Sequence, residues 1–285
     1  MNTDRPLDVI PETGNPVHDV QLNHRTIRFF EDKPVPLDEL NRIFDIANRT
    51  PTSTGMQLAS VIHVTDTKIK QALAEIATQE YLAECPVLLV YIVDLFRSDM
   101  ICQEAGSPSL VTADFDKFVQ GFTDGILMAQ NVNVAAEAAG LGAVYFGSIL
   151  NNPAKVTDLL KLPHLTFPII GHGLGYPADR PQLKPRMPKQ FRIFENKYQI
   201  LPDYHDAFRE YDALMEQYYD TRDINRRVDS FTKQVVKRFE LPNLRRQAIL
   251  QDVRNQGFNV DESLATDLGL VNKMRPVNDT GEMQD

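Results

Sequence analysis

Hydrophobic residues in the first 176 positions follow a helical spacing in some stretches and a strand-like pattern in others. A helical spacing that begins near Pro36 should end by Thr50, because Pro51 disfavours an α conformation in the residue before it. Asp38 is a candidate cap for its start. Further helices are expected over 69–76, 115–139 and 153–160, and strands over 60–65, 87–93, 143–146 and 167–171. This alternation predicts a domain of α+β or α/β type.

Two of these elements have the pattern of core elements. Residues 87–93 are continuously apolar after Pro86, which is typical of a strand buried on both faces. Residues 115–139 are the longest helical candidate and are apolar on several sides, as in a helix central to a core or to a subunit interface. Gly140 and Gly142 follow this helix in the manner of a C-cap.

The ends and the last third of the chain are less regular. Prolines and a glycine interrupt residues 1–20, so we expect a flexible arm there. Residues 177–200 hold four prolines and several basic residues and should form a long surface loop, followed by helices over 206–219, 230–239 and 244–255. The polar residues 261–285 are expected to fray. The predicted domains are the arm 1–20, one domain over 21–258 with 177–240 as a wrapping loop and helical excursion, and a polar tail over 259–285.

Composition narrows the class of protein. With 285 residues, 42% of them hydrophobic, the chain can bury a large core. A net charge of −9 gives no overall basic field for nucleic acid or an anionic membrane. No apolar run approaches the about 20 residues that span a bilayer, and residues 1–20 lack the apolar stretch of a signal peptide. The chain is therefore predicted to be cytoplasmic.

Cysteines and histidines provide no framework for a metal or for disulfides. The two cysteines lack the number and spacing of either, and they fit a reducing compartment. Cys85, which precedes Pro86 and the apolar run, is expected to be a buried, inert thiol. The six histidines are scattered, so no metal site is predicted. His63 is interpreted as a core residue of its strand.

Three short basic runs stand out in this acidic chain: His24-Arg25-Thr26-Ile27-Arg28, Lys184-Pro185-Arg186, and Arg222 with Arg226-Arg227. Arginine presents a planar fork of donors that matches phosphate oxygens, and lysine adds a point charge. Phosphate binding is one interpretation of these runs. The other is that each is a solvated surface cluster with acidic neighbours such as Glu31 and Asp223, and the residue types leave both open.

Two further segments have the composition of a ligand site. The loop Thr50-Pro51-Thr52-Ser53-Thr54-Gly55-Met56-Gln57 offers hydroxyls, backbone N–H groups and an amide to a planar heterocycle, although a capping turn explains it equally well. In Tyr145-Phe146-Gly147-Ser148, the glycine would let backbone amides approach a ligand closely, and a plain strand-to-loop turn is the alternative. The Gly-rich run 171–175 lacks the spacing of a dinucleotide fingerprint and is interpreted as a strand exit.

No acid, base or nucleophile occurs in a recognisable catalytic arrangement, which favours a bound cofactor that performs redox chemistry. Together the segments resemble the nitroreductase superfamily, in particular its NADPH-preferring, oxygen-insensitive nitroreductase and flavin reductase group. The likeness covers residues 24 to about 256. The segments that carry it are HRTIRFF (24–30), PTSTGMQ (51–57), LMAQN (127–131), AAEAAGLGAVYFGSILNN (135–152), GLGYPAD (173–179), LKPRMP (183–188) and INRRVDS (224–230).

The resemblance implies an α+β, FMN-dependent nitroreductase-like fold with a central, mostly antiparallel sheet flanked by helices. It also implies an intertwined homodimer with two FMN sites at the subunit interface, in which helix 115–139 is the central dimer-forming helix. No catalytic residue is implied in the protein itself, because flavin N5 carries the hydride.

The family's binding residues can be carried over position by position. Those implied to hold the FMN phosphate and ribityl chain are His24, Arg25, Thr26 and Arg28, with Lys184 and Arg186 completing the phosphate site. Those implied to line the flavin are Thr52, Ser53, Gln57 and Gln79, with Tyr145, Phe146, Gly147 and Ser148 offering backbone donors. Arg222, Arg226 and Arg227 match the segment that recognises the 2′-phosphate of NADPH.

Two departures from the family pattern lie near the flavin. Gly55 stands where relatives often carry a larger residue, and Thr78-Gln79-Glu80 lacks the usual glycine pair, so both affect the acceptor pocket. The implied function is an FMN-dependent NAD(P)H oxidoreductase that prefers NADPH and reduces nitroaromatics, quinones or flavins by ping-pong two-electron transfer. The alternatives are a flavin reductase that supplies reduced FMN to a partner, and a flavin-binding sensor without turnover.

Overall fold

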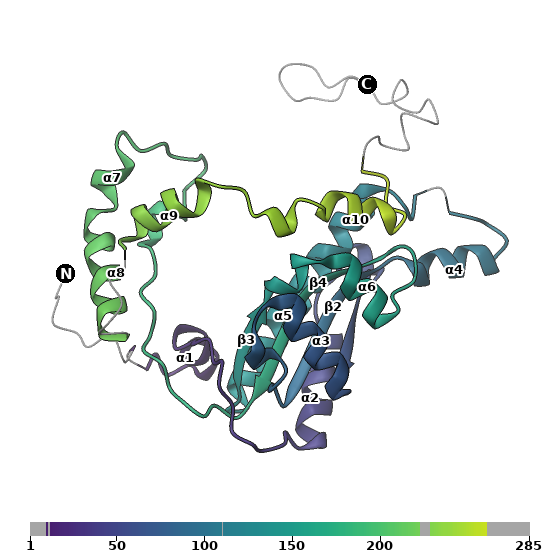
Figure 1. Cartoon of the computed structure of the whole chain (residues 1–285), viewed down its shortest axis with the longest axis horizontal. Helices are drawn as coiled ribbons and strands as arrows, with labels where there is room; N and C mark the ends of the chain where they lie inside the picture. Colours follow the sequence, from purple (N-terminus) through teal and green to yellow (C-terminus); the bar gives the residue numbers. More distant parts are fainter. Residues whose placement is uncertain (1–9, 11, 110, 223–228, 261–285) are drawn as a thin grey trace. The chain divides into compact units, whose positions relative to one another are not determined.

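The computed structural model describes residue 10 and residues 12–109, 111–222 and 229–260, and it divides into two compact units (Figure 1). The helical unit comprises Met1–Ile27 and Asp179–Leu244, and the sheet unit comprises Arg28–Ala178 and Arg245–Asp285, each over its described residues. The expected fraying of 261–285 concerns residues outside the described part of the chain.

The sheet unit is built on four antiparallel strands in the order β1-β2-β4-β3. The strands are β1 (Ala59–Val64), β2 (Val87–Asp94), β3 (Gly142–Phe146) and β4 (Thr166–Gly175). The predicted α+β fold with a mostly antiparallel central sheet is therefore confirmed. In this order β1 and β3 are the two edge strands, so segments that adjoin β1 and β3 lie at opposite edges of the sheet.

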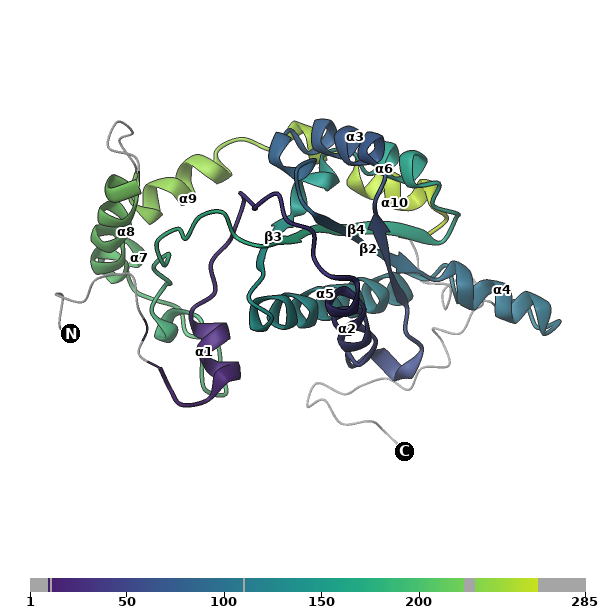
Figure 2. The ribbon, with the colours of Figure 1, turned by 90° about the horizontal axis from the view of Figure 1, so that it is seen from below.

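Helices cover both faces of this sheet (Figure 2). The helices of the unit are α2 (Leu37–Asn48), α3 (Thr67–Ala77), α4 (Phe96–Glu104), α5 (Phe115–Ala138), α6 (Pro153–Leu160) and α10 (Ile249–Asn255). Helices α2 and α5 pack on one face, against Leu89 and Tyr91 of β2. Helices α3 and α6 pack on the other, against Leu88 and Val90. Strand β2 is thus buried on both faces, as its continuous apolar run predicts.

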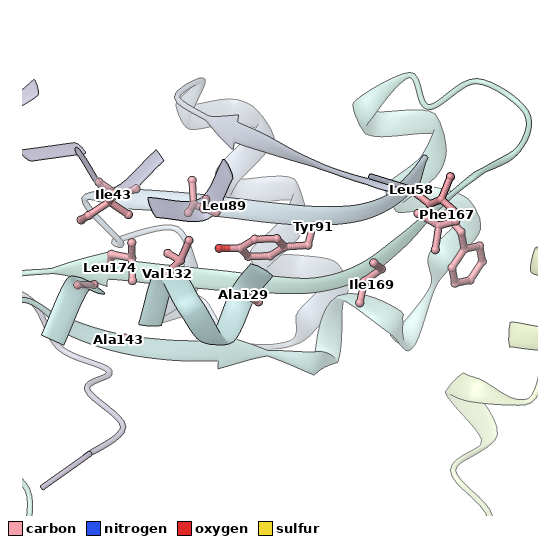
Figure 3. Close-up of a cluster of buried hydrophobic side chains, with 14 of the residues drawn as sticks. Ile43, Leu58, Leu89, Tyr91, Ala129, Val132, Ala143, Phe167, Ile169 and Leu174 are labelled. Carbon is pink, nitrogen blue, oxygen red and sulfur yellow. The ribbon is translucent and has the colours of Figure 1, made fainter. Parts of the chain in front are cut away.

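Helix α5 lies unusually close to the sheet because two of its residues are glycines. A Cβ at Gly121 would lie 2.6 Å from the Leu58 carbonyl oxygen, and one at Gly125 would lie 2.3 Å from Cδ1 of Ile169. Figure 3 shows the layer between them, where Tyr91 lies beside Ala129 and Val132 of α5. The prediction that residues 115–139 form a core helix is confirmed.

Several expectations about secondary structure need correction. The run 171–175 continues β4 rather than leaving it, because its glycines accommodate close neighbours: a Cβ at Gly173 would lie 2.4 Å from Sγ of Cys85. Asp38 does not cap α2, whose N-cap is Pro36. Residues 16–20 of the expected flexible arm belong to a helix, α1 (Pro16–Leu22), which Asn15 caps. Helix α4 was not predicted, because its apolar residues follow no helical stripe.

The helical unit has a small aromatic core of its own. Its helices are α1, α7 (Tyr204–Ala207), α8 (Arg209–Arg222) and α9 (Phe231–Phe239), with a 3-10 turn η4 (Lys189–Phe191) in the long loop. Phe208, Tyr211 and Met215 form the buried centre, against which Phe191 and Phe231 pack. The helices expected over 206–219 and 244–255 are each interrupted, the second into η5 (Leu244–Arg246) and α10.

Candidate functional site

Strand β3 and helix α3 end beside each other, and this brings together two of the predicted site residues. Oγ of Ser148 donates a hydrogen bond of 2.6 Å to Oε1 of Gln79. Ser148 lies in the 3-10 turn η3 (Gly147–Asn151) that follows β3, and Gln79 lies between α3 and the turn η2 (Glu80–Leu82). We call the set Thr78, Gln79, Gly147, Ser148, Arg245 and Arg246 the Gln79 corner.

Two arginines that the sequence did not single out complete this corner. Nη1 of Arg245 donates to Oγ1 of Thr78 at 3.1 Å, and Nη2 of Arg246 donates to the carbonyl oxygen of Gly147. Nε of Arg246 is buried and has no hydrogen-bond partner within the described part of the chain. A buried, unpaired donor is costly, so it favours an acceptor supplied from outside the protein. No sequence signal marks these residues, which lie in a short 3-10 turn far from the other motifs.

Nothing in the surrounding protein requires position 147 to be a glycine. Its φ is not positive, and a Cβ placed on it would meet only Nη2 of Arg246, at 3.9 Å. The glycine therefore leaves open space at the corner, as close approach of a ligand to the backbone needs. A plain strand-to-loop turn would tolerate a side chain at this position equally well, so the test of the space is whether a ligand uses it.

The side chains of Tyr145 and Phe146 point away from this space. The hydroxyl of Tyr145 donates to the carbonyl oxygen of Ala129 at 2.9 Å, and its ring stacks on His172 with centroids 4.4 Å apart. Burial raises the pKa of Tyr145. Phe146 is fully buried on the opposite face, against α3 and α6. The side chains of these two residues are therefore not directed at a ligand in the corner.

An aromatic series links the corner to the segment after the first basic run. The rings of Phe29 and Tyr81 have centroids 6.4 Å apart, and those of Tyr81 and Phe146 are 5.6 Å apart. The carbonyl oxygen of Phe29 also accepts from the N–H of Ala178 at 3.0 Å. Arg28, the residue before Phe29, is exposed.

The loop 50–57 is held by a buried carboxylate that the sequence did not reveal. Asp124 of α5 is 1% exposed and accepts from the N–H of Ser53 at 2.8 Å and from the N–H of Leu58 at 3.1 Å. Within the described residues no cation is paired with it. Thr52 makes no capping hydrogen bond to η1 (Ser53–Gly55), so its hydroxyl is not used as the capping-turn interpretation requires.

The backbone of this loop is strained. Thr54, Gly55 and Gln57 have φ values of 51°, 75° and 54°, in the left-handed region that only glycine adopts readily. Arg97 of α4 stabilises the end of the loop by donating to the carbonyl oxygen of Gln57 and, at 3.1 Å, to Oγ of Ser60. Thr52 and Gln57 line a cavity of about 570 Å³ together with Phe44, Met56, Arg97, Ile101, Met128 and neighbouring residues.

The loop 50–57 and the Gln79 corner lie at opposite edges of the sheet. The loop leads into β1, one edge strand, and Gly147 follows β3, the other edge strand. Three interstrand spacings of about 4.8 Å separate these edges by roughly 14 Å. One chain therefore presents two separate candidate half-sites, the loop 50–57 and the Gln79 corner.

In the helical unit, Arg25 of the first basic run contacts the segment that precedes the second run. Nε of Arg25 donates to the carbonyl oxygen of Pro181 at 2.9 Å, and its Nη1 donates to that of Asn23 at 3.0 Å. Lys184 and Arg186 are exposed on either side of buried Pro185, whose carbonyl oxygen accepts from the Tyr211 hydroxyl at 3.4 Å. His24, Thr26 and this second run thus belong to one unit. Of the third run, Arg222 ends α8, and Arg226 and Arg227 lie outside the described residues.

Cys85 is buried, as predicted, and burial raises its pKa to about 12, so its thiol is inert at neutral pH. No group of three or more metal-binding side chains occurs among the described residues. No helix in the described part of the chain has the length and apolar character needed to cross a membrane.

Comparison with known proteins identifies the family of the chain. Residues 22–176 match the family model described as "Nitroreductase family", and residues 184–261 match "Nitroreductase family, C-terminal domain". The chain is 36% identical over 245 residues to the oxygen-insensitive NADPH nitroreductase of Salmonella typhimurium, covering 86% of this chain and 98% of the relative. It is 32% identical over 242 residues to the FMN reductase (NADPH) of Bacillus subtilis, covering 84% and 96%.

Two solved structures are similar across most of the chain. The NADPH:FMN oxidoreductase of Vibrio harveyi, complexed with NAD+, superimposes with a TM-score of 0.76 at 30% identity, covering 86% of this chain and 99% of the other. NfrA1 of B. megaterium superimposes with a TM-score of 0.79 at 34% identity, covering 86% and 100%.

Proposed function

The chain belongs to the nitroreductase family, and on that premise we propose that it is an FMN-dependent NAD(P)H oxidoreductase that prefers NADPH. Its electron acceptors are nitroaromatics, quinones or free flavins. NADPH and the acceptor bind alternately at the same bound FMN, in a ping-pong cycle. The observation that carries the proposal is the Gln79 corner. There Gly147 leaves space that the protein does not need, next to the polar side chains of Gln79 and Ser148.

The residues present fit FMN. A flavin ring at the corner would meet the backbone of residues 145–148, the Gln79 amide and the buried, unpaired Nε of Arg246. His24, Arg25, Thr26, Arg28, Lys184 and Arg186 supply hydroxyl and cationic donors for the phosphate and ribityl chain. Thr52, Ser53 and Gln57 offer polar groups to the ring from the loop 50–57. Bound FMN supplies hydride acceptance from NADPH and two-electron transfer to the acceptor.

The chain's own part in this chemistry is to bind, orient and polarise. Donors at the corner are fixed before the reaction, so they can stabilise negative charge that develops on the ring without reorganisation. Fully buried Phe146 and Ile149 keep water out of the floor of the corner. The protein needs no acid, base or nucleophile of its own for this role.

The two half-sites lead us to propose an intertwined homodimer. A single ring cannot reach both the corner and the loop 50–57 of one chain across roughly 14 Å of sheet, so the loop of a second copy would complete each site. Helix α5 supplies a suitable interface, because its residues Phe115, Val119 and Ile126 are exposed. At about 100° per residue they lie within about 40° of one another on the helix surface. An exposed apolar row of this kind marks an interaction site.

Preference for NADPH is assigned to Arg222, Arg226 and Arg227, whose forked cations suit a 2′-phosphate. Arg222→Ala or Arg226→Ala should raise the KM for NADPH about tenfold and leave the KM for NADH nearly unchanged. Arg209→Ala, on the same helix but paired with Asp206, is the matched control. Equal effects on both nucleotides would contradict a 2′-phosphate role.

We place the enzyme in the cytoplasm, where NADPH and reduced thiols such as Cys85 and Cys102 are maintained. The primary test is an absorbance spectrum of the purified protein, followed by anaerobic titration with NADPH. We expect flavin bands that bleach on titration. A colourless protein that gains no FMN after refolding with it would contradict the proposal, and a flavin that NADPH cannot bleach would favour the sensor alternative.

A further inference from the structure

Thr78 has a backbone conformation that is unfavourable for its residue type. It follows α3 with φ 54° and ψ 41°, in the left-handed region. Glycine is the usual residue there, and a β-branched residue with this φ is a true outlier. Backbone strain of this kind persists where surrounding contacts impose it, often beside functional groups.

The strained residue Thr78 is in contact with Arg245, which lies far away in the sequence. Oγ1 of Thr78 accepts from Nη1 of Arg245 at 3.1 Å, across 167 positions of sequence. Glycine at position 78 would have no such acceptor. Thr78 and Arg245 therefore form a pair that depends on the threonine side chain.

The neighbouring arginine reaches the other half of the corner. Nη2 of Arg246 donates to the carbonyl oxygen of Gly147. The corner is made of the loop after α3, which holds Thr78 and Gln79, and the turn after β3, which holds Gly147 and Ser148. Arg245 and Arg246 of the turn η5 donate one hydrogen bond to each of these two segments. The 2.6 Å hydrogen bond from Ser148 to Gln79 joins the two segments to each other. Each bond joins segments distant in sequence, so the arrangement fixes the loops relative to one another.

The consequence concerns the amide of Gln79. Its Oε1 is occupied by the Ser148 hydroxyl, which leaves the two amide hydrogens for a ligand. Among the described residues this amide nitrogen donates no hydrogen bond. Gln79 follows Thr78 directly, so fixing Thr78 limits where this donor can point.

We propose that Thr78 and Arg245 are positioning residues, which together orient the Gln79 amide toward the flavin ring. This inference rests on the proposed function, because it requires a flavin at the corner. Neither residue touches the ring; both act through Gln79. An oriented donor stabilises charge that develops on the ring, so loss of the pair slows hydride uptake and lowers the reduction potential of the bound flavin.

The test uses the purified protein with bound FMN, mixed anaerobically with NADPH in a stopped-flow instrument. Thr78→Gly and Arg245→Ala should each slow flavin reduction by about 2- to 10-fold, as expected for loss of one hydrogen bond. The double variant should be no slower than either single variant, since both remove the same contact. Thr78→Ser keeps the hydroxyl and should stay within about twofold of the unaltered protein.

Thr78→Gly also separates positioning from stability. Glycine relieves the left-handed strain while it removes the hydrogen bond, so the Tm should change little although the rate and the potential fall. Lys161→Gly is the matched control, because Lys161 follows α6 with φ 51° and makes no contact with the corner. That variant should leave both the rate and the potential unchanged.

Two outcomes would overturn the positioning role while leaving the proposed function intact. One is a Thr78→Gly protein that binds FMN and has the normal reduction rate and potential. The other is a Thr78→Ser protein as impaired as Thr78→Gly, because the hydroxyl would then be irrelevant. A protein that binds no FMN at all would overturn the proposed function, and the positioning role with it.

Discussion

The two edges of the sheet present polar groups by opposite means. At the Gln79 corner the polar side chains bond one another across distant segments, and the layer beneath them is dry, with Leu82, Cys85, Phe146 and Ile149 all buried. At the loop 50–57 the backbone is strained, and the group beneath it is a buried carboxylate, Asp124. The corner is supported by packing and the loop by charge-assisted hydrogen bonds.

This difference predicts different responses to substitution. A corner supported by packing should keep its shape when a surface group is altered, so that changes there affect ligand binding more than stability. A loop that depends on one buried carboxylate should lose both together.

Asp124→Ala should be the most damaging change to the loop. It leaves the partly buried N–H of Ser53 and the buried N–H of Leu58 without an acceptor. An unpaired buried donor costs about 1–3 kcal/mol, so the free energy of unfolding should fall by about 3 kcal/mol. Urea denaturation measures this. Asp116→Ala, at an exposed position of the same helix, should change it by less than about 0.5 kcal/mol. Equal effects would show that the loop does not depend on Asp124.

The dry layer beneath the corner should make stability fall at alkaline pH. Burial raises the pKa of Cys85 from its usual value of 9.0 to about 12. Because the folded-state pKa lies above the unfolded one, this contribution is fully present below pH 9 and is lost as pH rises toward 12. Three pKa units correspond to about 4 kcal/mol. Burial lowers the pKa of Lys70, whose Nζ donates to the Cys85 carbonyl oxygen at 2.6 Å, and this partly offsets the loss.

The measurement is the free energy of unfolding of the unaltered protein and of Cys85→Ala across pH 8–12. The alanine variant should be less stable at pH 8 but should have a flatter profile between pH 9 and 12. Parallel profiles would mean that Cys85 ionises as easily in the folded state as in the unfolded state, and the layer beneath the corner would not be dry.

Gly147→Ala tests whether the space at the corner belongs to a ligand. The added Cβ meets only Nη2 of Arg246 at 3.9 Å, so stability should change by less than about 0.5 kcal/mol. A methyl group against a closely packed ring costs about 1–3 kcal/mol, so the Kd for FMN should rise at least about tenfold. Fluorescence titration of FMN into apoprotein measures this.

Gly173→Ala is the contrasting control, because its Cβ would lie 2.4 Å from Sγ of Cys85. This variant should lose about 1–3 kcal/mol of stability through overpacking. If Gly147→Ala instead lowered stability and left FMN affinity unchanged, the glycine would serve the turn and not a ligand.

The sequence predicted the elements with strong periodicity. The spacing over 115–139 and the apolar run over 87–93 gave α5 and β2 with nearly the observed bounds, because burial alone determines those patterns. The same reasoning failed at residues 171–175. There glycine reflects neighbours that approach the strand closely, such as Cys85 and Phe146, and a single sequence does not reveal such neighbours.

The candidate site was predicted only where residue type signals chemistry. Gln79 and Ser148 could be named from their segments, and the structure joins them. Four other residues could not be predicted from the sequence, because each acts through a contact with a segment 40 to 167 positions away. These residues are Asp124, Arg97, Arg245 and Arg246. The one signal that could have been used is Asp124 itself, an aspartate between the apolar positions Phe122 and Ile126 of the helix, since a buried carboxylate requires donors.

Arg97→Ala is the mildest test of the contrast and also its most discriminating one. Arg97 donates to the Gln57 carbonyl oxygen and pairs with Asp94 at 3.3 Å, but its side chain is about half exposed. An exposed pair contributes little, so stability should fall by less than about 1 kcal/mol. Gln57 would nonetheless lose the contact that accompanies its left-handed conformation, and the Kd for FMN should rise about threefold. Arg42→Ala, which breaks an exposed pair with Glu39 at 2.9 Å, is the matched control and should leave FMN affinity unchanged. A rise as large as that for Gly147→Ala would mean that the loop contacts the flavin as closely as the corner does, and the two edges would then contribute equally.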